Sequence, residues 1–270
     1  SGSISGGRVF INEEKAGEAG LKLPQRRMEA FRVRFAIGSR RDALLEDLGA
    51  EISRKVVTSG ALRGRFDRGN LRLTSAGGDI PAGAWVYTSM LIDNLWNDSK
   101  ALRWDRLERA GESIRVSGAS RRFPFSMEWR VEPGEKDTLR LFIDLIVNER
   151  IEVQEYHASL VAPIAYEEWA TPSEKGTFPP IRTDSNDWVH LNKEYMTGTY
   201  MATSGTSVPR IEFGVGEQNE MVLTAVNANY SENYRVLQAL ATPKHGSFVF
   251  EPGRHRYFEG SVSIGPGRAD

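Results

Sequence analysis

Two residues capable of acid–base chemistry, Glu155 and His157, lie two positions apart near the end of an alternating segment that runs from Thr138 to Ala162. The segment begins as an apolar strand and becomes polar where these two residues occur. In a strand, such residues point to the same face, with Cβ atoms about 7 Å apart. A carboxyl group and an imidazole at that separation could flank one substrate atom as general acid and general base. We therefore expect the two side chains to share one surface.

The last alternating segment of the chain supplies a second pair, His255 and Tyr257, on one face of its strand. If that strand lay beside the strand of Glu155 and His157, two imidazoles, a carboxylate and a phenol would converge as in an acid–base site. The alternative is structural. A single histidine on a strand commonly hydrogen-bonds within the fold, and the apolar residues soon after His157 are compatible with that role.

The segment 93–99 offers aromatic and polar side chains in one turn region, namely Trp96, Asn97 and Asp98. Recognition of a sugar needs a flat aromatic face for the apolar side of the ring and planar polar groups for the hydroxyls. These residue types therefore favour a ligand-binding loop. The alternative is that Trp96 covers the core while its neighbours make Asx turns.

A long irregular segment from Tyr166 to Lys193 interrupts the strand pattern and contains Trp169 and Trp188. Long loops in compact domains often carry function, and a tryptophan in a loop has fewer core partners than one in a strand. We expect both tryptophans to bind ligand, with packing of the loop onto the domain as the alternative. The tryptophans in alternating strands are expected in the core: Trp85, Trp104 and Trp129.

The sequence gives little support for a metal site, a serine hydrolase, a phosphate-binding loop or a polysaccharide lyase. Glu155 and His157 could ligate a metal, but no third ligand follows at an informative spacing, so neither a metal nor another cofactor is expected. There is no GxSxG motif and no glycine-rich strand–turn–helix. A polysaccharide lyase would need a base and a group that neutralises a uronate, for which Tyr156, Arg150 and Asn148 have no diagnostic spacing.

Composition limits the partners. The 270 residues carry a formal net charge of -1, which gives no field to recruit nucleic acid or an acidic membrane. No run approaches the length of a membrane-spanning helix, and the composition is that of a folded, soluble domain. There are no cysteines, which excludes disulfides and leaves the compartment open. The oligomeric state is likewise open.

From Asn70 onward, short alternating runs recur every ten to twelve residues with turn residues between them. This spacing is too short for crossover helices, so it predicts an all-β fold, a large antiparallel two-sheet β-sandwich. Before it, strands are expected at Arg8–Asn12 and Phe31–Ile37 and one short helix between Ser39 and Gly49. The expected domains are residues 1–69, packed on a sandwich of residues 70–265, and a tail, 266–270.

The succession of strands resembles the galactose mutarotase-like supersandwich of sugar epimerases, polysaccharide lyases and accessory domains of glycan-processing proteins. The similarity covers about residues 70–264 and rests on strand rhythm, without a diagnostic motif. The segments that carry it are GNLRLTSAGG, AWVYTSMLIDNLWNDS, SIRVSG, FPFSMEWRVE and LRLFIDLIVNERIEVQEYHASL. The resemblance implies a concave sheet that meets carbohydrate.

The function expected first is therefore noncatalytic recognition of a poly- or oligosaccharide, as one module of a larger, bacterial-type glycan-processing protein. The second is an enzyme of the same fold, a sugar epimerase or polysaccharide lyase that uses Glu155 and His157 with help from His255 or Tyr257. The third is a structural domain that contacts protein through a sheet edge or aromatic patch.

Overall fold

The computed structural model describes residues 53–76, 80, 84–182, 184, 187–196, 198–217, 221–228 and 234–265. By its contacts the chain divides into Ser1–Arg54 and Lys55–Asp270, and every strand named below belongs to the second unit. The strands expected at Arg8–Asn12 and Phe31–Ile37 and the helix expected between Ser39 and Gly49 lie outside the described residues. In the part described, no helix combines the length and apolar character needed to cross a membrane.

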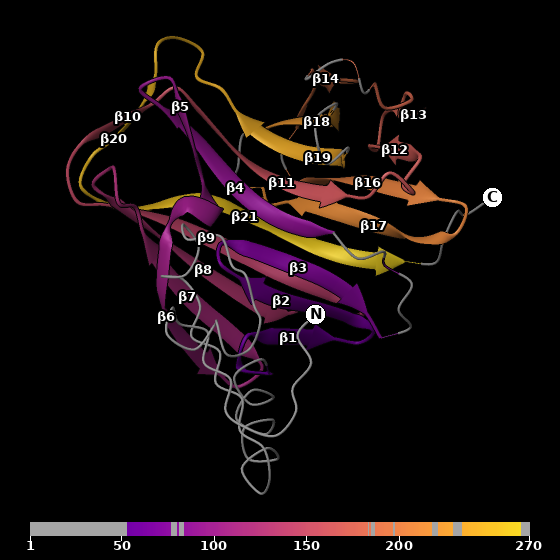
Figure 1. The fold of residues 1–270 in the computed structure, drawn as a ribbon, viewed down its shortest axis with the longest axis horizontal. Coiled ribbons are helices and arrows are strands. Elements are labelled where there is room, and N and C mark those ends of the chain that lie inside the picture. Colours follow the sequence, from indigo (N-terminus) through magenta and orange to yellow (C-terminus); the bar gives the residue numbers. More distant parts are fainter. Residues whose placement is uncertain are drawn as a thin grey trace, which may run out of the picture. The chain divides into compact units, whose positions relative to one another are not determined.

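The larger sheet has ten strands, which pair antiparallel throughout (Figure 1). Its main path runs through β1 (Val56–Ser59), β2 (Leu62–Asp67), β3 (Asn70–Ser75), β4 (Trp85–Ile92), β11 (Glu155–Ala162), β19 (Tyr234–Ala241), β18 (Met221–Ala228) and β14 (Trp188–His190). In addition, β5 (Leu95–Asp98) pairs with β4, and β15 (Glu194–Met196) pairs with β18. A short 3-10 helix, Ser99–Ala101, follows β5.

The second sheet has nine strands and is also antiparallel. Its order is β13 (Lys175–Thr177), β12 (Glu168–Ala170), β16 (Thr199–Gly205), β17 (Val208–Val215), β21 (Gly253–Gly265), β9 (Thr138–Val147), β8 (Phe125–Pro133), β7 (Ser113–Ala119) and β6 (Arg103–Ala110). The long strand β21 lies between β17 and β9 (Figure 1). A separate pair joins β10 (Ile151–Val153) to β20 (Phe248–Phe250).

One hydrophobic core receives the inward residues of both sheets, which makes the domain a two-sheet β-sandwich as predicted. Alternate residues of β9 are buried, as their period-2 pattern indicates, and they meet the inward residues of β4 and β11. Among these inward residues are Leu139, Leu141, Ile143, Leu145, Val147, Val86, Met90, Ala158 and Leu160.

The segment Thr138–Ala162 is divided between the two sheets. Strand β9 belongs to the nine-stranded sheet and β11 to the ten-stranded sheet, so the two do not pair. The chain also breaks at Gln154, whose backbone N–H donates to the Leu91 carbonyl. The break shifts the alternation by one residue. The parity that buries Val153 therefore does not continue, and Tyr156 and the alternate residues after it pack against the core.

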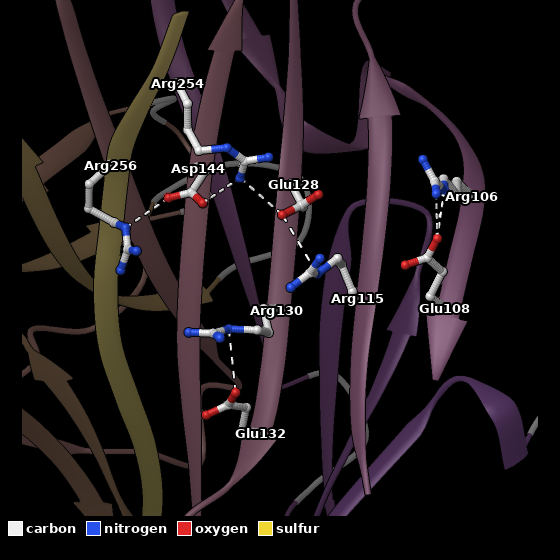
Figure 2. Close-up of polar contacts among 9 residues, drawn as sticks. All are labelled: Arg106, Glu108, Arg115, Glu128, Arg130, Glu132, Asp144, Arg254 and Arg256. Atoms are coloured by element: carbon white, nitrogen blue, oxygen red, sulfur yellow. Dashed lines mark hydrogen bonds and ion pairs between the residues drawn. The ribbon is translucent and has the colours of Figure 1, made fainter. Parts of the chain in front are cut away.

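The outer face of the nine-stranded sheet carries a ladder of paired charges (Figure 2). Arg254 Nη1 lies 2.7 Å from Asp144 Oδ2 and 3.0 Å from Glu128 Oε1, and Arg256 Nε lies 2.8 Å from the other Asp144 oxygen. The Arg130 guanidinium covers the ring of Phe142, 4.2 Å from its centroid. The charges on this face are therefore largely compensated by one another.

Candidate functional site

A groove of about 1020 Å³ crosses the outer face of the ten-stranded sheet. Strands β4, β11 and β19 form its floor, and each of them pairs with a neighbour on both sides. Because the sheet uses the backbone donors and acceptors of these strands, the side chains supply most of the chemistry of the groove.

Strand register gathers four polar or aromatic residues at one end of the groove. In the sheet, Asp98 lies opposite Ser89, which lies opposite His157. In the next row, Leu91 separates Trp96 from Glu155. Since adjacent strands are less than 5 Å apart, the rows bring Trp96, Asp98, Glu155 and His157 to one wall and floor.

His157 is 5 % exposed. Its Nδ1 lies 2.9 Å from Ser159 Oγ, and the rings of Trp96 and Tyr87 lie 5.4 and 5.5 Å from its ring centroid. Burial lowers the pKa of His157 to about 4, although the nearby Asp98 carboxylate acts in the opposite direction. Among the described residues Nε2 has no hydrogen-bond partner, so it can accept or donate a hydrogen bond to a ligand.

Asp98 and Glu155, the two carboxyl groups at this end of the groove, have different environments. Asp98 accepts a hydrogen bond of 2.7 Å from Ser89 Oγ and lies 3.3 Å from Lys100 Nζ. Glu155 has no hydrogen bond or ion pair with any described residue, and partial burial raises its pKa. Partial burial therefore favours the protonated form of Glu155, whose side chain lines the groove and is open to a ligand.

Aromatic rings form the other end of the groove. Four of them pack around a small apolar cluster on this face, separate from the main core: Trp85, Tyr87, Trp188 and Tyr234. The rings of Trp85 and Tyr234 meet edge to face, with centroids 4.7 Å apart. Trp85 was expected in the core, and that expectation is wrong. Its outward parity on β4 places it in the groove, while Val86 and the alternate residues after it face the core.

The groove is also lined by residues that sequence analysis did not single out, on strands β14 and β19. His190 Nδ1 lies 3.1 Å from Thr224 Oγ1, and the pKa of His190 is lowered by burial and by Lys193. Gln238 Nε2 donates to Ser159 Oγ at 3.4 Å. Polar residues at outward positions of otherwise apolar strands were the available signal, but their importance depends on β18 and β19 lying beside β11.

The predicted ligand-binding residues do not all reach the groove. Trp96, half exposed, Asp98 and Trp188 line it. Asn97 points to the other side of β5 and donates to the Leu95 carbonyl at 2.7 Å. Trp169 is 8 % exposed and belongs to the core, with its ring against Gly176 in the nine-stranded sheet.

His255 and Tyr257 do not join Glu155 and His157. Both are on β21, which pairs with β9 and β17 and not with β11, so the condition for convergence is not met. His255 Nε2 lies 2.7 Å from the Glu251 carbonyl oxygen. Tyr257 is fully buried, and its hydroxyl donates to backbone carbonyls of the opposite sheet. Neither residue is placed to touch a ligand in the groove.

The groove therefore combines aromatic side chains at both ends with hydrogen-bonding side chains between them. It also contains Glu155, whose pKa is raised by burial, and His157, whose pKa is lowered by burial. Within the described ranges, no three histidine or acidic side chains are grouped so as to hold a metal ion.

No family model matches the chain, and no curated protein matches it. Among solved structures, it is similar to a putative kojibiose phosphorylase from the human microbiome, with a TM-score of 0.40 and 6% sequence identity. The match covers 79% of this chain and 30% of that protein, so the chain spans less than a third of its length. Similarity at this level assigns neither a family nor a function.

Proposed function

We propose that the chain is a carbohydrate-recognition module that holds an oligo- or polysaccharide in the groove of its ten-stranded sheet. The observation that supports this most directly is the composition of the groove, with aromatic rings at both ends and polar side chains on the floor. Binding on a concave sheet is also what the resemblance to galactose mutarotase-like supersandwiches implies. Such a module would serve as one part of a larger glycan-processing protein.

The groove suits a ligand with many hydroxyl groups. Aromatic side chains such as Trp85 and Trp96 offer apolar faces or edges to a sugar ring, and Glu155 and His157 offer hydrogen-bonding capacity that no described residue uses. Unmatched polar groups are costly when buried, so a ligand that satisfies these side chains gains affinity and specificity.

A glycan array with the fluorescently labelled full chain tests the proposal, followed by calorimetry on each hit. We expect a restricted set of saccharides to bind, and Trp96→Ala to weaken binding about tenfold through the loss of ring contact. Tyr200→Ala is the matched control, because Tyr200 is an exposed aromatic residue of the nine-stranded sheet. An array without any hit, or equal binding by Trp96→Ala and wild type, would contradict the proposal.

A second candidate function is catalysis on the same ligand by Glu155 and His157. Their shared face and their opposite pKa shifts support it, because a carboxyl group that is easily protonated and a neutral imidazole can serve as acid and base. Each saccharide that binds should be followed by NMR for epimerisation and by ultraviolet absorbance for an unsaturated lyase product.

If the protein is an enzyme, His157→Asn and Glu155→Gln should each reduce turnover by about 10² or more while the urea unfolding midpoint changes little. If wild-type protein leaves every bound saccharide unchanged, catalysis is contradicted and noncatalytic recognition remains the proposed function. A large loss of stability in His157→Asn would indicate a structural role for this histidine.

A further inference from the structure

We infer that the groove contains two separate saccharide subsites and binds an extended chain that contacts both; this inference rests on the proposed function. The polar subsite is formed by Trp96, Glu155 and His157, and the aromatic subsite by Trp85 and Tyr234. Both sets line one continuous groove, so a single ligand can reach from one to the other.

The separation of the subsites follows from strand geometry. Trp85 and Leu91 lie six residues apart on β4, and Trp96 lies directly opposite Leu91 on β5. At a rise of about 3.3 Å per residue, the backbones of the two tryptophans are about 20 Å apart along the strand direction. His157, which lies opposite Ser89, is about 13 Å from Trp85 along the same direction. Both distances exceed the length of a pyranose ring. One sugar unit therefore cannot contact both subsites.

The floor between the subsites combines the ring of Tyr87 with polar side chains. On β4 the outward positions between them are Tyr87 and Ser89, and Gln238 lines the floor from β19. Ser89 lines the groove here with a short, buried side chain. The intervening units of a saccharide chain could then place hydroxyl groups over Tyr87 and Gln238.

The backbone pairing of the floor favours a saccharide over a peptide. A peptide that binds by strand addition needs the free edge of a sheet, whereas β4, β11 and β19 each have two partners. The charges of the lining residues are mixed, with Arg72, Lys100 and Lys193 against Asp98 and Glu155. A strong positive field of the kind that recruits nucleic acid is absent from this set of lining residues.

Calorimetry on the full chain with glucose and with the malto-, cello- and laminari-oligosaccharides from dimer to hexamer tests the inference. In a series that binds, affinity should rise about tenfold or more from dimer to hexamer, as the second subsite is filled. Trp85→Ala and Trp96→Ala should each weaken hexamer binding about tenfold, and only one of them should weaken dimer binding. Tyr200→Ala should change neither.

Near-ultraviolet circular dichroism and the unfolding midpoint check that each variant is folded. Since Trp85 packs on the outer apolar cluster, Trp85→Leu provides a second variant that keeps an apolar side chain but removes the ring. Equal affinity for the disaccharide and the hexasaccharide would overturn the two-subsite inference. So would a disaccharide whose binding is weakened by both tryptophan substitutions. Either result would leave the proposed recognition of saccharides unaffected. If no series binds, the two-subsite inference is overturned. The glycan array then shows whether the chain binds any other saccharide, and an array without a hit would contradict the proposed function as well.

Discussion

The hydroxyl group of Tyr257, on the nine-stranded sheet, donates to the backbone carbonyl oxygen of His157 on the ten-stranded sheet at 3.0 Å. The same hydroxyl lies 2.7 Å from the carbonyl oxygen of Ser89, the cross-strand neighbour of His157. One buried side chain therefore crosses the core and ties together the two strands that carry the polar end of the groove. Although Tyr257 was predicted as a catalytic residue, the contact indicates a structural role.

Tyr257→Phe should lower the free energy of unfolding by about 1 kcal/mol, because it removes a buried hydrogen bond. Tyr166→Phe is the matched comparison, since Tyr166 is also fully buried but its hydroxyl has no partner among the described residues. That change should be neutral or stabilising, because it removes an unpaired polar group. Urea unfolding followed by tryptophan fluorescence measures both. Equal losses in the two variants would contradict the role assigned to Tyr257.

The stability of the domain should depend on pH through His157. Its pKa in the folded state is about 4, below the ordinary value of 6.5, so between these values the unfolded chain binds the proton more tightly. The contribution of neutral His157 to the free energy of unfolding is fully present above pH 6.5. It is lost as pH falls toward 4, and the loss is on the order of 3 kcal/mol. The effect should be smaller in His157→Asn. An NMR titration in which the His157 ring titrates near its ordinary pKa would contradict this prediction.

Two substitutions in the charge ladder of Figure 2 should differ in cost. Arg254 is half exposed, so Arg254→Gln should cost less than about 1 kcal/mol, and the loss should shrink in high salt. Asp144 is more buried and pairs with both Arg254 and Arg256, so Asp144→Asn should cost more, about 1–2 kcal/mol. Urea unfolding at low and high ionic strength measures the difference. Neither variant should alter saccharide binding, because the ladder lies outside the groove.

Gly118 on β7 should not tolerate a side chain. A Cβ atom there would lie 2.5 Å from the Trp104 ring, which is fixed by a hydrogen bond of 2.8 Å from its Nε1 to the Ser99 carbonyl. Gly118→Ala should therefore destabilise the domain by about 1–3 kcal/mol. Gly265→Ala is the control, because nothing lies within 4 Å of the added atom. Thermal unfolding of both variants tests the prediction, which fails if their midpoints agree.

Much of the fold could be predicted from the sequence because strand alternation is local. The pattern from Leu139 to Val147 identified a strand with one buried face, and the short spacing of such patterns indicated an antiparallel sandwich. The same local rule placed Glu155 and His157 on one face. It could not identify which face meets solvent, because the break at Gln154 shifts the alternation by one residue.

The remaining features of the site depend on contacts between segments far apart in the chain. Trp85 and Trp169 have the same chemistry, yet one lies in the groove and the other in the core. Which of them is exposed depends on the partners of β4 and β12. His255 and Tyr257 have the right chemistry for a site, but β21 pairs in the other sheet. By itself, the sequence determined the strands and the side chains that share a face, because these follow from a two-residue repeat. Only the tertiary structure decided which faces form the groove, because pairing and sheet membership arise from packing across the whole chain.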